Sequence, residues 1–215
     1  DCGTVGGDEF VYVADESRIV LVDPTNMTVE TILGSMMGAE MQQFFRNQGW
    51  VTVAEDSAGN KYAVSDERKQ VMKFDSAFQL VAAFGADGVA GYDDEHLYAP
   101  RDLIHDANAG LVYVTDQTQP STGTSWIGRV VVLDSTTLEY QDQYDLDYSA
   151  IGLAFLQDAG TAGKLYIAGK NELTKIALPI FSAIPFLKIL GLVTKISSPT
   201  SCSLSLSSRV KAFQP

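Results

Sequence analysis

The sequence predicts an all-β fold built from about four similar units. A run of β-branched or aromatic residues that ends in a small residue and Asp recurs along the chain, at intervals of about 50 residues. Its four copies are Tyr12–Asp15, Ala63–Asp66, Tyr113–Asp116 and, with Gly in the last place, Tyr166–Gly169. A second apolar run follows each copy. Repetition of this length, made of short strands, is typical of the blades of a β-propeller.

Each unit contains enough strands for one four-stranded antiparallel blade. The recurring run is the second strand of its unit, and the first strands are predicted at 51–56, 102–106 and 152–158. The third strands are predicted at 19–23, 71–75, 130–134 and 173–177, and the fourth strands at 28–32, 80–84 and 140–144. We therefore expect one domain, 1–215, with blades at 8–34 plus 202–213, 49–86, 98–146 and 149–198.

The residues that follow the first strands are typical of tight turns. Asp56, Asp106 and Asp158 each precede a short stretch that contains glycine. An Asp side chain at the start of a turn accepts backbone N–H bonds, and glycine adopts the positive φ that many turns need. These aspartates are therefore expected to close hairpins.

The middle of the chain resembles a known repeat. The residues that carry the resemblance are Phe84–Gly88, Leu97–Asp106, Gly110 and Tyr113–Asp116. Together they are similar to the NHL-type propeller repeat, most clearly between residues 50 and 134. The last unit departs from it, because Gly169 stands where the repeat has Asp. The resemblance implies the fold and little about activity, since NHL-like propellers include scaffolds, ligand binders and a few enzymes.

The two ends of the chain are expected to meet. About ten residues precede Tyr12, so the first blade is predicted to begin at its second strand. The segment 202–213, which begins with alternating residues, could supply the missing inner strand and close the ring. That arrangement places Cys202 beside Cys2 and predicts a disulfide, which would close a loop of about 200 residues and contribute several kcal/mol. The alternative is a longer propeller of which this chain is a part.

Three features favour a secreted, extracellular protein. The chain has two cysteines, one near each end, and its composition is rich in Ser, Thr and Gly. Asn26-Met27-Thr28 is an N-glycosylation sequon after Asp23-Pro24, so Asn26 is expected in an exposed turn. The alternative is that the cysteines are unrelated thiols and that the sequon arose by chance.

Charge and hydropathy exclude two classes of partner. The net charge of −12 repels phosphate backbones and anionic lipid, so neither nucleic acid nor an acidic membrane surface is expected. The most apolar stretch, 176–196, is interrupted by two prolines, two lysines and a glycine. About 20 uninterrupted apolar residues would be needed to cross a bilayer, so no transmembrane segment is predicted.

Three residues on predicted inner strands are candidates for a metal or acid–base site. Glu55, Asp102 and His105 would face the central channel, where they could bind a divalent cation such as calcium. Calcium-dependent sugar-lactone hydrolases built on propellers place acidic and Asn ligands there. The alternative is that the neighbouring aspartates only close turns while Glu55 and His105 face solvent. Zinc catalysis is disfavoured because the chain has two histidines, and no GxSxG, HExxH or P-loop motif is present.

Three regions outside the repeat are candidate partner surfaces. Residues 35–47 carry Met and Phe at helical spacing, and 117–127 is an insertion in the third blade. Residues 179–198 are longer and more apolar than one outer strand requires. The acidic loop 87–95 lacks the EF-hand spacing and is expected to be solvated. The partner-binding candidates are Met37, Met41, Phe44, Trp126, Phe186 and Leu190.

These observations favour a secreted propeller that binds or assembles and does not catalyse. No cofactor is expected, and the partner would be another protein or a second copy of the chain. The alternative is a small extracellular, lactonase-like hydrolase with a divalent metal in the channel.

Overall fold

The computed structural model describes residues 2–5, 8–15, 18–32, 48–119, 125–156, 163–178 and 192–197. In this part of the chain all regular structure is β, arranged as four antiparallel sheets of four strands each. The first sheet contains β1 (Cys2–Val5), β2 (Asp8–Asp15), β3 (Arg18–Asp23) and β4 (Thr28–Ile32). The second contains β5 (Trp50–Glu55), β6 (Lys61–Ser65), β7 (Gln70–Phe74) and β8 (Leu80–Phe84).

The remaining strands form two sheets of the same design. The third sheet contains β9 (Pro100–Asp106), β10 (Leu111–Thr118), β11 (Ile127–Asp134) and β12 (Tyr140–Leu146). The fourth contains β13 (Ala150–Leu156), β14 (Lys164–Gly169), β15 (Glu172–Ala177) and β16 (Leu192–Ser197). Within each sheet the strands pair in sequence order. Such four-stranded sheets, stacked one after another, are the blades of a β-propeller, so the predicted fold class is confirmed.

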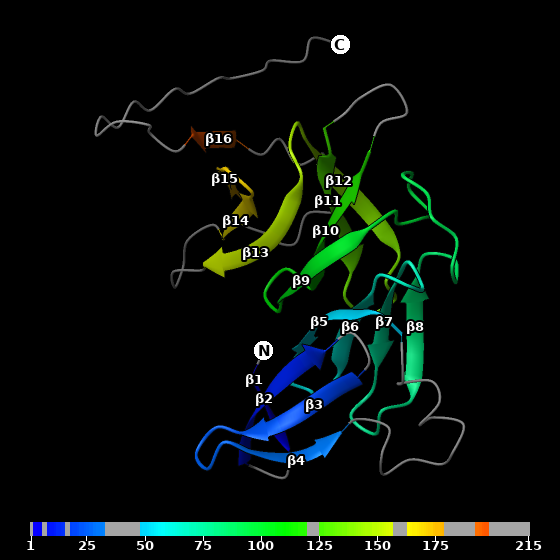
Figure 1. Ribbon diagram of the computed structural model, residues 1–215, viewed down its shortest axis with the longest axis vertical. Coiled ribbons are helices and arrows are strands. Elements are labelled where there is room, and N and C mark those ends of the chain that lie inside the picture. Colours follow the sequence, from blue (N-terminus) through cyan, green and yellow to red (C-terminus); the bar gives the residue numbers. More distant parts are fainter. Residues whose placement is uncertain are drawn as a thin grey trace.

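The sheets pack face to face in the order of the chain. Figure 1 shows β9 between β5 and β13, and these first strands of successive blades are in contact. Three apolar seams join the blades. Tyr12 and Leu21 pack with Trp50 in the first seam, and Val64 packs with Val112 in the second. The third seam brings side chains of the third blade against the fourth, with Tyr113, Val130, Leu165 and Ile167 among its members.

The continuous apolar runs in the sequence follow from this packing. Successive side chains of a strand point to opposite faces, and both faces of a middle blade are covered by neighbours. In β6, Ala63 packs in the first seam while Tyr62 and Val64 pack in the second. All residues of β6 and of β10 are therefore buried.

Aspartate-led turns connect many of the strands, as the sequence predicts. Asp56 Oδ1 accepts the backbone N–H groups of Ala58 and Asn60, both at 2.9 Å. Asp106 Oδ1 accepts the N–H of Asn108 at 3.0 Å in the matching turn of the third blade. Asp158 lies outside the described residues.

The first blade is completed differently from the prediction. We expected 202–213 to supply its inner strand, but the inner edge of β2 is occupied by β1. Cys2 pairs with Val11 and Val5 with Asp8, so only Gly6 and Gly7 separate the two strands. A local hairpin closes a far smaller loop than a segment some 200 residues away, so its entropic cost is lower. Residues 198–215, with Cys202, lie outside the described residues.

The fourth blade ends as expected, in an outer strand taken from the apolar stretch after Leu178. β16 supplies that strand and pairs with β15. The glycine that replaces the repeat Asp has a steric reason in this blade. A Cβ atom added at Gly169 would lie 2.4 Å from the ring of Tyr148 and 2.9 Å from the carbonyl oxygen of Ser149. Tyr148 therefore occupies the space that an Asp side chain would need.

In the described part of the chain, no helix has the length and apolar character needed to cross a membrane.

Candidate functional site

The three predicted metal ligands are described, but the structure does not bring them together. Glu55 lies on β5 with its carboxylate 3.7 Å from the ammonium group of Lys61, and both side chains are almost fully buried. Asp102 and His105 lie on β9 and have separate environments. Among the described residues, no three His, Cys, Asp or Glu side chains form a group that could hold a metal ion.

Asp102 joins the third blade to the fourth. Its Oδ2 accepts the backbone N–H of Leu153 on β13 at 2.7 Å, and its Oδ1 accepts the N–H of Leu103 at 2.8 Å. Burial raises the pKa of Asp102, and the two N–H donors act in the opposite direction. Oδ2 thus links the inner strands of two neighbouring blades, while Oδ1 is engaged within β9.

His105 lies in the seam between the second and third blades. Its ring stacks on that of Tyr62, with centroids 5.0 Å apart and planes 12° from parallel. Burial lowers the pKa of His105, and the nearby carboxylates of Asp56 and Asp106 oppose that effect. The Tyr62 hydroxyl lies 2.9 Å from the carbonyl oxygen of Ser135 and so ties the second blade to a turn of the third. The stacked pair is part of a packed seam.

The predicted partner-binding residues fall into two groups. Trp126 is 40% exposed and meets the ring of Tyr98 edge-on, with centroids 6.3 Å apart. The residues Met37, Met41, Phe44, Phe186 and Leu190 lie outside the described residues.

The acidic loop 87–95, between the second and third blades, contains specific hydrogen bonds that the sequence did not predict. Asp93 Oδ1 accepts the backbone N–H groups of Glu95 and His96 at 3.0 and 2.9 Å, and it lies 2.8 Å from His96 Nδ1. These contacts lower the pKa of Asp93, with the N–H of Glu95 contributing most. Asp94 and Glu95 are exposed, as expected for a solvated loop.

A buried ion pair holds this loop against the third blade. The side chains of Arg129 on β11 and Asp116 on β10 have no solvent-exposed surface, and Arg129 Nη2 lies 3.0 Å from Asp116 Oδ2. The guanidinium also donates to the carbonyl oxygens of Asp93 at 2.6 Å and His96 at 2.7 Å. It lies 4.3 Å from the ring centroid of Tyr92.

Asp116 completes the clamp with its other oxygen. Its Oδ1 accepts the backbone N–H groups of Tyr98 and Ala99 at 3.0 and 2.8 Å. We define the loop clamp as Arg129 together with Asp116. In the sequence Asp116 was predicted only as a member of the repeat, and Arg129 was not a predicted site residue. The signal that could have identified Arg129 is a charged residue placed inside the apolar run 127–134.

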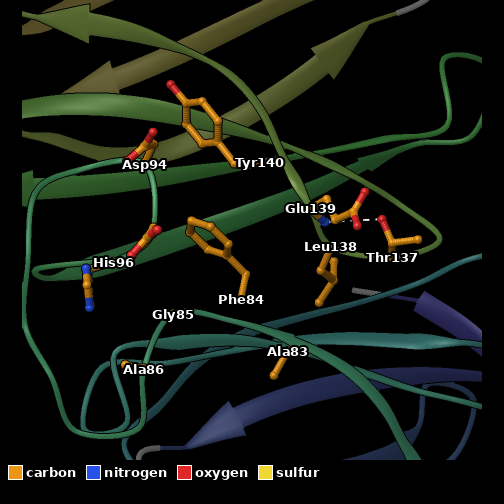
Figure 2. Close-up of a pocket in the computed structure, with 11 residues that line it drawn as sticks. Ala83, Phe84, Gly85, Ala86, Asp94, His96, Thr137, Leu138, Glu139 and Tyr140 are labelled. Carbon is orange, nitrogen blue, oxygen red and sulfur yellow. Dashed lines mark hydrogen bonds between the residues drawn. The ribbon is translucent and has the colours of Figure 1, made fainter.

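The clamped loop forms one wall of an open pocket of about 420 Å³ between the second and third blades. The opposite walls are the end of β8 and the turn between β11 and β12. Figure 2 shows Phe84 among the lining side chains, with Asp94 and Tyr140 above it in the view and Leu138 and Glu139 to one side. The lining residues are Ala83, Phe84, Gly85, Ala86, Asp94, Glu95, His96, Thr137, Leu138, Glu139 and Tyr140.

The pocket combines an apolar floor with an acidic rim. Phe84 and Leu138 are buried, whereas the carboxylates of Asp94, Glu95 and Glu139 are exposed. Leu138 has a φ of 60°, and the turn that carries it is led by Asp134, whose Oδ1 accepts the N–H groups of the next residues of the turn. The pocket was not predicted, because its walls come from three separate parts of the chain.

Gly85 fixes the backbone at the edge of the pocket. It has a φ of 92°, and a Cβ atom added there would lie 2.3 Å from the carbonyl oxygen of Lys69. Only glycine fits this position without a shift of the backbone.

Comparison with known proteins supports the fold and no specific family. No protein-family model matches the chain, and no curated protein matches it either. A solved structure of a functionally unknown protein from Desulfotomaculum acetoxidans is similar, with a TM-score of 0.55 and 10% identity. The match covers 93% of this chain and 65% of that one, so this chain spans less than two thirds of the other protein's length.

Two further solved structures are similar at a lower level. The β-propeller domain of Cps50 (Swd1) from Myceliophteria thermophila has a TM-score of 0.42 and 10% identity, over 88% of this chain and 76% of that one. A streptogramin B lyase has a TM-score of 0.44 and 9% identity, over 93% of this chain and 68% of that one.

Proposed function

We propose that this chain is an extracellular, non-catalytic binding module that holds a protein partner at the pocket between the second and third blades. The observation that carries the proposal is the pairing of an apolar floor with an acidic rim in that pocket. A Lys or Arg side chain has the complementary chemistry, since its methylene stem packs on apolar surface while its charged head stays near water. The occupant is therefore a basic side chain within a segment of another protein.

The pocket is suited to binding because its walls are held before any partner arrives. The loop clamp fixes residues 93–99 through hydrogen bonds to the carbonyls of Asp93 and His96 and to the N–H groups of Tyr98 and Ala99. A preformed site requires little ordering on association, so more of the contact energy contributes to affinity.

The environments of the buried ionisable groups favour binding over catalysis. Asp102 engages two backbone N–H groups, Asp116 engages Arg129, and His105 is stacked in a seam. A general base needs to reach a substrate proton, and these side chains are engaged with other groups of the protein. The NHL-like residues around 84–116 are consistent with a scaffold, which is how many such propellers act.

The proposed extracellular location rests on two features of the sequence, the sequon at Asn26 and the two cysteines near the ends of the chain. Asn26 lies in an exposed turn between β3 and β4, and this exposure supports its use as a glycosylation site. Glycosylation of Asn26 and the Cys2–Cys202 disulfide stay predictions. Cys2 begins β1.

The pocket can be tested with two short peptides, Ac-Leu-Arg-Leu-NH2 and Ac-Leu-Gln-Leu-NH2, followed by NMR on the labelled protein. We expect the Arg peptide to shift the amide signals of Gly85 and Glu139 at millimolar concentration, and the Gln peptide to shift them less. The Glu139→Gln variant should weaken the Arg response several-fold. Asp15→Asn on the first blade removes the same charge far along the chain and should leave the response unchanged. Equal responses to both peptides, or a response that Glu139→Gln does not alter, would refute the proposal.

A further inference from the structure

The outer strand of the third blade has an open edge. β12 pairs with β11 on one side, and no other described strand pairs with it on the other side. Gln141 and Asp145 on this strand are exposed. The strand contains no proline, a residue that would remove a backbone donor. An edge of this kind presents unpaired N–H and C=O groups, to which a further strand can form main-chain hydrogen bonds.

The open edge begins at the pocket. Glu139 and Tyr140, where β12 starts, both line the pocket (Figure 2). A segment that pairs along β12 therefore has one of its ends at the pocket. The outer strands β4, β8 and β12 all pair antiparallel with their neighbours. Antiparallel addition to β12 brings the C-terminal end of the added strand to the pocket.

The charge of β12 distinguishes it from the other outer strands. Glu139, Asp142 and Asp145 lie three residues apart, and the segment 139–146 contains no Lys or Arg. By contrast, β8 has no charged residue, β4 has one acidic residue and β16 has one lysine. Like charges on facing strands are unfavourable, whereas opposite charges stabilise the pair. The edge of β12 therefore disfavours another acidic strand, including β12 of a second copy, and fits a basic one.

We propose that the partner adds an extended, basic segment to β12 as a fifth, antiparallel strand of the third blade. The inference rests on the proposed function, because the Lys or Arg that enters the pocket is the residue near the C-terminal end of that strand. Two further basic residues, three and six positions before it, lie opposite Asp142 and Asp145. Main-chain hydrogen bonds supply affinity, and the spacing of the basic residues supplies specificity.

Synthetic peptides, with NMR on the labelled protein, test the inference. The extended peptide is Ac-Lys-Thr-Val-Lys-Val-Leu-Arg-Leu-NH2, and Ac-Leu-Arg-Leu-NH2 reaches the pocket alone. We expect the extended peptide to bind about tenfold more tightly, because it adds two opposite-charge pairs. It should shift the amide signals of residues 141–145 as well as that of Gly85. Ac-Lys-Lys-Val-Thr-Val-Leu-Arg-Leu-NH2 has the same composition but no lysine opposite Asp142, and it should bind several-fold more weakly than the extended peptide.

Methylation of the peptide backbone distinguishes strand addition from contact by side chains alone. In an extended strand successive N–H groups point to opposite edges, so only one alternate set can bond to β12. One version of the extended peptide is N-methylated at its second, fourth and sixth residues, and another at its third, fifth and seventh. We expect one version to lose the added affinity and the other to retain it.

Substitutions in the protein test the charges. Asp142→Asn and Asp145→Asn should each weaken binding of the extended peptide several-fold and leave binding of the short one unchanged. Both carboxylates accept hydrogen bonds from Gln143 at 2.9 Å, and the Asn side-chain oxygen can accept them too, so the strand is preserved. Glu30→Gln removes the same charge from the outer strand β4 and is the matched control. It should bind both peptides like the parent chain.

The outcomes separate this inference from the proposed function. If the short peptide binds and the extended peptide binds no more tightly, strand addition is overturned while the pocket proposal stands. Equal behaviour of the two methylated peptides would have the same meaning. Failure of both the short and the extended peptide to bind would overturn both proposals. Binding of the extended peptide alone, unaffected by Glu139→Gln, would place the partner away from the pocket and would also overturn both.

Discussion

Replacing Arg129 with Met should destabilise the protein through the loop clamp. The guanidinium makes five hydrogen bonds: two to Asp116 Oδ2, and one each to the carbonyl oxygens of Asp93 and His96 and to Gln143 Oε1. Met fills most of the volume but supplies no donor, so the buried Asp116 carboxylate loses its counter-charge. Removing one partner of a buried ion pair costs about 3–5 kcal/mol, and we expect a loss of this size.

The pH dependence of the loss identifies its cause. Burial already raises the pKa of Asp116, with Arg129 acting against that effect. Without the guanidinium the pKa of Asp116 should rise further. The stabilising contribution of a group whose pKa is raised on folding is present at low pH and is lost as the pH rises through the folded-state pKa. The difference between Arg129→Met and the parent should therefore be larger at pH 7 than at pH 4.

The assay is equilibrium unfolding in urea, followed by tryptophan fluorescence at both pH values. Arg18→Met is the control, because Arg18 and Asp15 form an exposed pair with side-chain exposures of 48% and 55%. An exposed pair contributes at most about 1 kcal/mol, so this control should unfold almost like the parent. A loss below about 1 kcal/mol for Arg129→Met would refute the clamp, and so would an equal loss at pH 4 and pH 7.

Three other predictions concern single positions. Gly85→Ala should destabilise the protein by about 1–3 kcal/mol or more, because at this positive φ the new Cβ would meet the carbonyl oxygen of Lys69. Gly88→Ala is the control: its φ is also positive but its Cβ would have open space, so it should cost only about 1 kcal/mol. Similar urea midpoints for the two variants would contradict this prediction. The pKa of His105 is lowered by burial, so the parent should lose stability as the pH falls below about 6.5, and His105→Phe should lose less over that range. Unfolding curves at pH 7.5 and 5.5 measure it, and parallel changes in both proteins would count against it. Expression through a eukaryotic secretory route should add a glycan at Asn26 that Asn26→Gln removes, as seen by intact mass; an unchanged mass would remove the support for secretion.

The blades could be predicted from the sequence because their signals are local. Runs of β-branched and aromatic residues determine the length of each strand, and the Asp and Gly residues between the runs determine the position of each turn. All of these residues lie close together in the chain. The outer strands β4 and β8 have the bounds expected from their residues alone. The turn that carries Asn26 was identified in the same way.

The inner strand of the first blade was assigned wrongly for a reason that is also local. Cys2–Val5 is a short run with little hydrophobic signal, and the alternating segment after Cys202 gave a stronger pattern. The two glycines that follow Val5 are a hairpin signal. A two-residue loop pairs Cys2–Val5 with the strand that follows it directly, in preference to a distant segment.

The structure gives the three predicted metal ligands separate environments. Glu55 and His105 were expected to share a channel because their strands have the same place in the repeat. Yet each side chain meets a different neighbour: Glu55 lies near Lys61 of its own blade, and His105 stacks on Tyr62 of the preceding blade. Strand order alone did not determine which side chains meet.

The sequence by itself determined the architecture of this protein: short strands, aspartate-led turns and a period of about 50 residues, all of which depend on residues close together in the chain. Only the tertiary structure decided where a ligand could bind and which faces remain open. The pocket joins Phe84, Glu95 and Leu138, and the loop clamp joins Asp93 to Arg129, through contacts between residues far apart in sequence. Such contacts follow from how whole blades stack, because a side chain's partner on the next sheet is set by the packing of both sheets and leaves no periodic trace in either strand.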